Sequence, residues 1–337
     1  MKPSKKIAIG SVLAVAIVCG GASFGSSNIS FFDTLKIIAG KALSMPLAEG
    51  LDPRDVSIVW LLRLPRALLA FIVGGSMAMS GGVVQSALKN QLASPFILGV
   101  SSGASLGAAL VMLTGISIPL VGSLTLPVVG FLFGLLTVYF VISFSSMVDK
   151  TTSNNTIILF GMVFTLFVNG LLTTLMALFR EELKNLITWQ MGSFALKGWS
   201  YVRVMLPFFV IGTFGVIRYA REMDILTFGE DQAKSVGVET EKVRKHLFVF
   251  STLLTGSAVA LSGVIGFVDL IAPHMARKIV GSNHRYVLPM SFLLGGSLMV
   301  ITDLIARSIV SPSELPVGAI TALVGGPFFA WVYFRKR

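Results

Sequence analysis

Apolar runs of membrane-spanning length follow one another along almost the whole chain. A membrane helix needs roughly 20 mostly apolar residues. Such runs occupy residues 7–24, 58–80, 96–113, 124–146, 156–179, 201–219, 246–267, 287–306 and 316–334. Only 13% of the residues are charged, whereas a soluble domain carries about 25%. The sequence therefore predicts an all-α polytopic membrane protein in which residues 1–337 form a single transmembrane domain.

Basic clusters at the two ends of the chain constrain the number of crossings. Lys2, Lys5 and Lys6 precede the first apolar run, and residues 335–337 are Arg-Lys-Arg. The positive-inside rule places both clusters in the cytoplasm, so the number of crossings is even. Counting 268–281 as a short or broken crossing gives ten. Because further spans follow it, the helix at 7–24 is expected to be an uncleaved first span rather than a signal peptide.

The net charge of +11 does not indicate nucleic-acid binding, because the basic residues are spread over short loops between apolar runs. The longest of these loops, residues 220–246, carries charges of both signs. Ala233, Val236 and Val238 give it a small apolar face. We interpret it as two short helices on the membrane surface that dock a partner; the alternative is a solvated connector.

A faint internal repeat relates the two halves of the chain. Residues 74–81 read GGSMAMSG, and residues 256–263 read GSAVALSG. This pattern predicts two inverted five-helix repeats, at about 58–179 and about 246–334, an arrangement typical of transporters. Chance similarity between helices rich in small residues is the alternative.

The stretch from Leu64 to Leu110 predicts two closely packed helices joined by a polar turn at residues 89–95. Gly99, Gly103 and Gly107 recur at a spacing of four, which on a helix forms one stripe without side chains. Such a stripe lets another helix approach at backbone distance.

Sequence motifs for catalysis and metal binding are not found. The chain has no phosphate-binding Gly-x4-Gly-Lys-Ser/Thr loop, and its three histidines lack metal-ligand spacing. We therefore expect no enzymatic activity, no metal and no cofactor in this chain. Asp303 and Arg307 lie four apart and are predicted to pair on one helix face. Asp269 has three possible roles: lining a pathway, bonding a neighbouring broken helix, or lying at the outer interface.

Two long stretches resemble a known permease family. The matching residues of the first are Leu64-Pro65-Arg66, Gly74, Ser80-Gly81, Gln85, Asn90, Leu92-Ala93, Pro95, Leu98-Gly99 and Gly103-Ala104. Those of the second include Ser262-Gly263, Gly266-Phe267-Val268, Ala272-Pro273-His274, Ala276-Arg277, His284-Arg285, Asp303, Ala306-Arg307, Glu314-Leu315-Pro316-Val317-Gly318 and Gly325-Gly326-Pro327. In these residues the chain resembles the FecCD-type permeases of bacterial ABC importers for iron–siderophore complexes, haem and cobalamin. The departures from the family pattern are Gln91, Ser94, Asp269 and Asn283.

The resemblance implies a permease subunit in the bacterial cytoplasmic membrane, with both termini cytoplasmic. Its implied partners are a second permease, identical or a paralogue, two ATPase subunits that bind ATP and magnesium, and an extracytoplasmic binding protein. An iron–siderophore complex is the expected ligand, with haem and cobalamin left open. The alternative is an ion-coupled secondary transporter, which the shortage of carboxylates in the predicted spans disfavours.

The resemblance also implies three sets of site residues. The ATPase-coupling set is Gly229, Glu230, Asp231, Ala233, Gly237 and Val238. The set that docks the binding protein is Arg63, Arg66 and Arg307. The pathway and helix-packing set is Ser80, Gly81, Gln85, Asn90, Pro95, Gly99, Gly103, Gly107, Asp269, Pro273 and His274.

Overall fold

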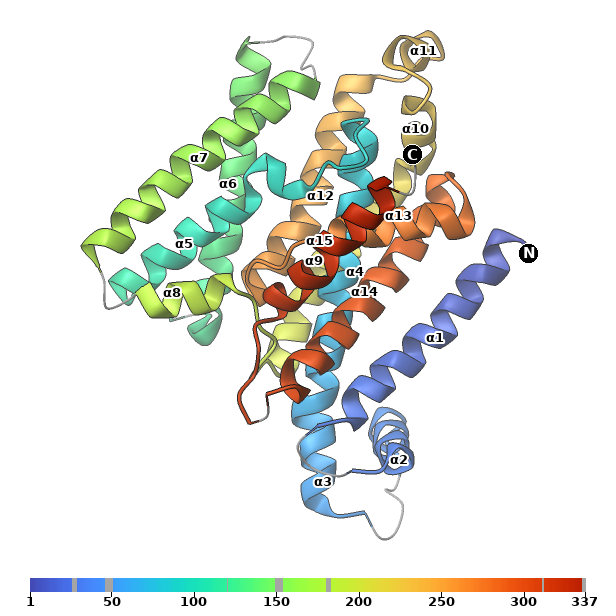
Figure 1. The fold of residues 1–337 in the computed structure, drawn as a ribbon, viewed down its shortest axis with the longest axis vertical. Helices are drawn as coiled ribbons and strands as arrows, with labels where there is room; N and C mark the ends of the chain where they lie inside the picture. The colour runs from blue at the N-terminus through green and yellow to red at the C-terminus, as the bar shows by residue number, and fades with distance from the viewer. Residues whose placement is uncertain are drawn as a thin grey trace.

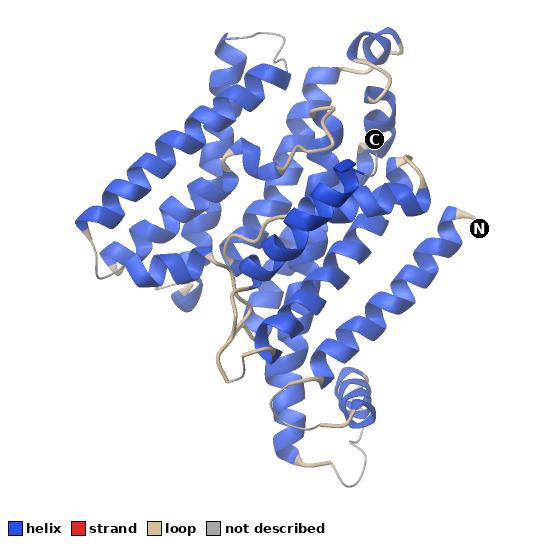
Figure 2. Cartoon of the chain, in the orientation of Figure 1, coloured by secondary structure: helices blue, strands red, loops and turns tan. Residues whose placement is uncertain are grey.

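A computed structural model describes residues 1–25, 29–45, 51–119, 121–148, 154–179, 183–310 and 312–334 (Figure 1). All regular secondary structure in these ranges is helical, without a strand (Figure 2). The basic residues 335–337, used to predict a cytoplasmic C-terminus, lie outside the described ranges. The predicted all-α architecture is confirmed.

The first half begins with the long helix α1 (Pro3–Ser23) and the short helix α2 (Phe31–Ala42). A continuous rod follows, formed by α3 (Pro53–Ser57), a π-helical stretch (Ile58–Arg63) and α4 (Leu64–Ala87). The span predicted at 58–80 is shorter than this rod, which begins before residue 58 and ends after residue 80. The remaining helices of this half are a 3-10 turn η2 (Pro95–Leu98), α5 (Val100–Thr114), a 3-10 turn η3 (Gly122–Leu124), α6 (Thr125–Val148) and α7 (Asn154–Leu178).

The second half contains several shorter helices. Its elements are α8 (Leu183–Gln190), α9 (Trp199–Arg218), α10 (Ala220–Leu226), α11 (Glu230–Ser235), α12 (Thr240–Ser262), α13 (Val268–Val280), α14 (His284–Ser308) and α15 (Val317–Phe334). The two short surface helices predicted at 220–246 correspond to α10 and α11.

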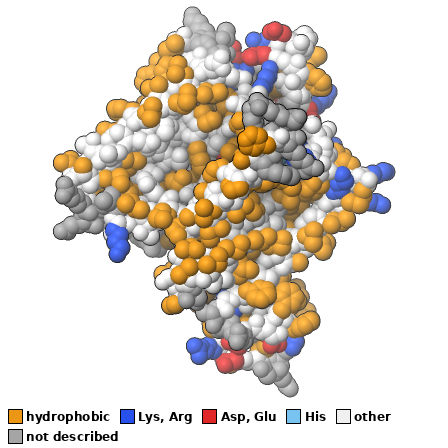
Figure 3. All heavy atoms as spheres, viewed as in Figure 1, with side chains coloured by type: hydrophobic (Ala, Val, Ile, Leu, Met, Phe, Trp, Pro, Cys, Tyr) orange, Lys and Arg blue, Asp and Glu red, His pale blue; other side chains and the backbone are white. Residues whose placement is uncertain are grey.

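Among the residues that the structure describes, six helical stretches are long and apolar enough to cross a membrane. They are Pro3–Ser23, Pro53–Ala87, Gly122–Val148, Asn154–Leu178, Trp199–Arg218 and His284–Ser308. Shorter apolar helices cover Val100–Thr114 and Val317–Ala330. Hydrophobic side chains cover the middle of the surface seen in Figure 3, and the charged ones lie around its outline. The chain is therefore a multi-pass membrane protein.

Helix α4 lies at the centre of the bundle, and almost all of its residues are buried (Figure 1). Its most extensive contact is with α14, followed by α12 and α13. Gly74 and Gly295 make this possible, because a Cβ atom on either would collide with the backbone oxygen of the other. The close helix packing expected from glycine therefore has its centre at the α4–α14 contact.

The predicted glycine stripe on α5 is wrong at its first position. Gly99 has a φ of 79° and precedes α5, so the helix begins only at Val100. A left-handed residue cannot continue a right-handed helix, and glycine adopts this conformation without steric cost. Gly103 and Gly107 do lie against α6: a Cβ on Gly107 would come within 2.9 Å of Phe133 and Val129 atoms.

Candidate functional site

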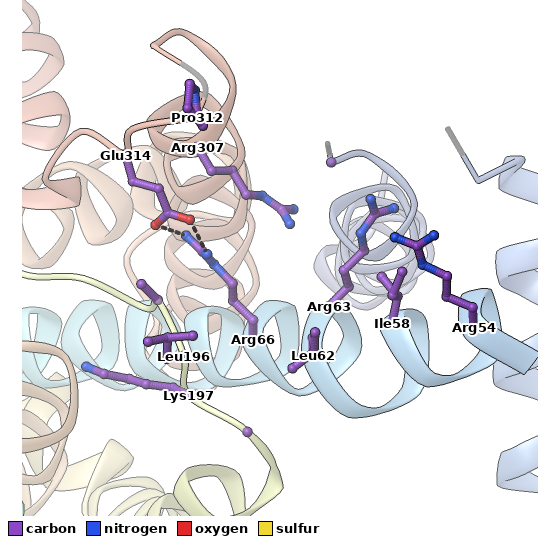
Figure 4. A pocket seen from close by; sticks show the side chains of 13 residues that line it. Arg54, Ile58, Leu62, Arg63, Arg66, Leu196, Lys197, Arg307, Pro312 and Glu314 are labelled. Carbon is purple, nitrogen blue, oxygen red and sulfur yellow. Dashed lines mark hydrogen bonds and ion pairs between the residues drawn. The ribbon is translucent and has the colours of Figure 1, made fainter. Parts of the chain in front are cut away.

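A cavity of about 580 Å³ lies at the α3 end of the molecule, where α4, the end of α14 and the 195–198 loop converge (Figure 4). Its charged lining, called here the basic cavity, consists of Arg54, Arg63, Arg66, Lys197, Arg307 and Glu314. Five basic side chains against one acidic side chain give this surface an excess of positive charge.

Arg66 is the central side chain of the basic cavity. Its guanidinium binds Asp303 through Nε–Oδ2 (3.0 Å) and Nη2–Oδ1 (2.8 Å). It also binds Glu314 through Nη1–Oε1 (2.7 Å) and Nη2–Oε2 (2.9 Å), the pair marked in Figure 4. Hydrogen bonding to Arg66 is the main reason why the pKa of Glu314 is lowered. The predicted Asp303–Arg307 pair is present but longer, with Nε–Oδ2 at 3.9 Å.

The arginines predicted to dock a binding protein are engaged within the chain. Arg63 is 6% exposed and donates from Nη1 to the Ser23 carbonyl at 2.6 Å. Arg307 donates to the Gly21 carbonyl. Arg54, which sequence reasoning did not select, is exposed at the start of α3 and lies beside Arg63 in Figure 4. Docking by Arg63, Arg66 and Arg307 stays a prediction, and Arg54 joins them as the accessible cation.

Lys197 is a second residue that sequence reasoning missed. Its Nζ donates to the Ser193 carbonyl (2.6 Å) and to the Leu261 carbonyl in the last turn of α12. Burial, with a contribution from nearby Arg66, lowers the pKa of Lys197 to about 7. No sequence pattern distinguishes it, because a single lysine in a loop is usually solvated.

A buried polar seam joins α4 to α12. The Ser80 hydroxyl donates to the Ser251 carbonyl at 2.9 Å and accepts from Thr255 Oγ1 at 2.6 Å. Gly81, one residue further on α4, lies against the backbone of Asp269, leaving no room for a Cβ. Ser80 and Gly81 thus contribute to helix packing, and their place on a pathway stays a prediction.

Asp269 is 1% exposed and accepts a hydrogen bond from the Ser94 hydroxyl. Its backbone carbonyl accepts from Gln85 Nε2 at 3.4 Å, while Gln85 Oε1 accepts from Arg277 at 2.5 Å. Ser94 precedes η2, and Asp269 lies in the first turn of α13. Among the three roles left open for Asp269, this geometry fits the bond to a neighbouring broken segment.

The other members of the packing set are dispersed. The Asn90 side chain accepts from the Leu92 amide at 2.9 Å and shapes the exposed turn after α4. Pro95 opens η2, and Pro273 faces Gly82 from within α13. His274 meets the edge of the Phe328 ring, with the centroids 6.3 Å apart. The structure brings Ser80, Gly81, Gln85, Asp269 and Pro273 together along α4, and the Asn90 N–H donates to the Gln85 carbonyl at 3.0 Å. The His274 ring instead packs on Phe328, and Gly103 and Gly107 lie against α6.

Residues 219–246, called here the coupling segment, form the opposite end of the molecule from α3 (Figure 1). Glu230 ties α11 to α12 by binding Arg244 Nη2 at 3.1 Å and Thr240 Oγ1 at 3.2 Å. Burial alone would raise the pKa of Glu230, but Arg244 outweighs it and the pKa is lowered.

The apolar face of the coupling segment differs from the predicted one at Ala233, whereas Val236 is exposed as predicted. Ala233 is fully buried and packs α11 against the bundle. Phe228 is 79% exposed and Val236 is 66% exposed. Gly229 and Gly237 flank α11 with φ values of 138° and 85°. Those conformations favour glycine, which explains why both ends of α11 carry one.

A sequence profile of the FecCD transport family matches residues 12–335. The chain belongs to this family. It is 40% identical over 327 residues to an uncharacterized ABC transporter permease protein, YvrB, of Bacillus subtilis (strain 168), covering 97% of this chain and 92% of the relative. It is 33% identical to the hemin transport system permease protein HmuU of Yersinia pestis, covering 97% and 94%.

The fold of this chain is also seen in a solved structure, described as an inward-facing conformation of a metal-chelate type ABC transporter. That chain is 30% identical, with a TM-score of 0.84, and the match covers 98% of this chain and 99% of the other. The resemblance drawn from the sequence motifs is therefore confirmed.

Proposed function

We propose that this FecCD-family chain is the permease subunit of an ABC importer that moves an iron–siderophore complex, haem or cobalamin across the bacterial cytoplasmic membrane. The observation that carries this proposal is the placement of two charged surfaces at opposite ends of the same helices. The basic cavity lies at the α3 end of α4 and α14, and the coupling segment lies against their other ends. An ATPase would act on this subunit from one side of the membrane and a binding protein from the other, so each end of the helices needs a docking surface.

The proposed topology has ten crossings, two inverted five-helix repeats and cytoplasmic termini. It is supported by a helix at each of the ten predicted positions, including α13 for the broken crossing at 268–281. α13 has 13 residues, which is short for a full crossing. It follows left-handed Phe267, as expected of a broken membrane helix that packs inside protein.

The proposed partners are a second permease chain, two ATPase subunits that bind ATP and magnesium, and an extracytoplasmic binding protein. The exposed side chains of Phe228 and Val236 support docking of an ATPase, because apolar side chains on a charged surface are suited to fill a pocket of a partner protein. The excess of basic over acidic side chains in the basic cavity, with Arg54 exposed, supports docking of an acidic surface on the binding protein.

The ligand class rests on the family and its relatives. A hemin permease and a metal-chelate type transporter are among the similar proteins. Both names indicate that the transported ligand is a bulky chelated metal. We infer that selectivity resides mainly in the binding protein.

Transport by the purified importer in proteoliposomes tests the proposal. The chain, the ATPase that copurifies with it and the binding protein are reconstituted, and uptake of a radioactive ferric siderophore, haem and cobalamin is measured. Uptake of one ligand that requires ATP and survives a protonophore is expected. Uptake that collapses with the protonophore and persists without ATP would instead establish a secondary transporter.

A further inference from the structure

A contact between α10 and the first residue of α14 stands apart from the sites described above. Oδ1 of Asp224 accepts two hydrogen bonds from His284, from the backbone N–H at 2.9 Å and from the ring Nδ1 at 2.6 Å. His284 is 2% exposed. The two residues are 60 positions apart, so the contact joins the coupling segment to a long membrane helix.

The groups that meet in this contact favour strong hydrogen bonds. The first N–H groups of a helix lack intrahelical partners and carry partial positive charge. Asn283 satisfies one of them by accepting from Arg285 N at 3.0 Å, and Asp224 satisfies that of His284. Asp224 therefore caps α14 from another element, with a carboxylate that also accepts from the imidazole.

Apolar packing holds α10 against the same helix ends. Met223 and Leu226, on either side of Asp224, are buried in one cluster with Leu288 of α14. Val84 of α4 belongs to this cluster as well. A displacement of α10 is thus passed to α14 and α4 together.

α14 and α4 are held together at two places along their length. Gly74 and Gly295 bring their backbones into contact at mid-length. At the far end the Arg66–Asp303 ion pair locks the two helices together. Asp303 is 19 residues beyond His284, roughly 28 Å along α14. One rigid pair therefore joins the coupling segment to the basic cavity.

We propose that the Asp224–His284 contact is the joint through which movement of the coupling segment reaches the α4–α14 pair and, through it, the basic cavity. The inference rests on the proposed function, since it assumes that an ATPase drives the coupling segment. Asp224 is a positioning residue that acts through α14.

The test separates hydrolysis from transport in the complete reconstituted importer. Asp224→Ala is expected to lower uptake per ATP hydrolysed at least tenfold while the complex still hydrolyses ATP. Asp224→Asn keeps an acceptor oxygen and should restore part of the ratio, and His284→Ala should resemble Asp224→Ala. Asp33→Ala is the control, because Asp33 is an exposed carboxylate of α2 that pairs with exposed Lys36 and lies outside the coupling segment and the basic cavity; its ratio should equal that of the parent.

A distance measurement keeps the proposal testable if a variant loses activity for another reason. Spin labels at Ile309 and Leu178, both exposed, report movement of the end of α14 relative to α7 in a Cys19→Ser background. We expect the distance to change on ATP binding in the parent and to stay fixed in Asp224→Ala.

Two results would overturn the inference while the proposed function stands. One is an unchanged ratio of uptake to hydrolysis in Asp224→Ala, or a fall in both activities in equal proportion. The other is an ATP-induced change in label distance that persists without Asp224. A parent complex that shows no ATP-driven uptake would instead contradict the proposed function itself.

Discussion

Arg66 of α4 and Asp303 of α14 form a two-point ion pair, 2.8 and 3.0 Å long, that closes one end of the most extensive helix–helix contact among the described residues. Asp303 is 1% exposed, and the Arg66 side chain is 12% exposed. A charge buried to this extent is tolerated because its partner is present. The pair therefore stabilises the bundle as long as both members remain.

Removing one member of this pair should be costly. Asp303→Asn is expected to lower the free energy of unfolding by up to about 3 kcal/mol, because the buried Arg66 loses one of its two carboxylate partners and keeps Glu314. The measurement is unfolding of the detergent-solubilised protein followed by tryptophan fluorescence. Asp33→Asn is the control: its partner Lys36 is 3.2 Å away and both side chains are exposed, so about 0 to 1 kcal/mol is expected. Equal effects in the two variants would contradict the role of burial.

Sequence reasoning found one of the partners of Asp303 and missed the stronger one. Arg307 is four residues away on the same helix, and such a pair follows from helical periodicity. Arg66 lies 237 residues earlier, and its pairing depends on how α4 and α14 pack. The fold class and the positions of the long helices could be predicted from apolar runs, because each membrane span is recognised by its own composition and does not depend on a distant partner.

Two further details could not be predicted from the periodicity of the sequence. Gly99 fits the spacing of a helical stripe, yet its left-handed conformation ends the turn before α5. The sequence predicted Ala233 on an exposed apolar face, but its side chain in α11 is buried against the bundle. In both cases three-dimensional packing decides between conformations that the local sequence permits equally.

Adjacent glycines on α4 should respond differently to the same substitution. In Gly81→Ala the new methyl would overlap the Asp269 backbone, so we expect destabilisation of about 1 to 3 kcal/mol. In Gly82→Ala the nearest atom, Pro273 Cβ, is 3.4 Å away. Alanine favours a helix by about 1 kcal/mol over glycine, so this variant should be neutral or slightly stabilised. Thermal unfolding of the two variants side by side checks the packing of α4 against α13.

The stability of the protein should depend on pH through Lys197. Its pKa is about 7 in the folded protein and has a usual value of 10.5. Between pH 7 and 10.5 the unfolded chain binds more protons at this site, so its contribution to folding stability rises with pH in that window. Below pH 7 both states are protonated and the contribution is constant.

Lys197→Met removes this titration. The stability of the parent relative to the variant should therefore increase from pH 7 to pH 9.5, and it should not change between pH 6 and pH 5. Thermal midpoints at the four pH values give the comparison, with Lys242→Met, at an exposed lysine, as the control. A parent–variant difference that stays constant from pH 7 to pH 9.5 would show that the burial of Lys197 does not govern its protonation.

Arg54 should contribute to docking of the binding protein without contributing to stability. Its side chain is exposed and lines the basic cavity, whereas Arg63 is buried. An exposed ion pair is worth about 0 to 1 kcal/mol, and reversing the charge adds repulsion. Arg54→Glu should therefore weaken binding about tenfold, a change of about 1.4 kcal/mol, and the loss should shrink at high salt.

Surface plasmon resonance with the purified binding protein and the importer in nanodiscs measures this effect. Arg203→Glu is the matched control, since Arg203 is an exposed arginine at the same end of the bundle, near the start of α9, and does not line the basic cavity. A specific role for the cavity requires a larger loss from Arg54→Glu than from Arg203→Glu. Equal losses would mean that the net charge of this face, and not the basic cavity, attracts the binding protein.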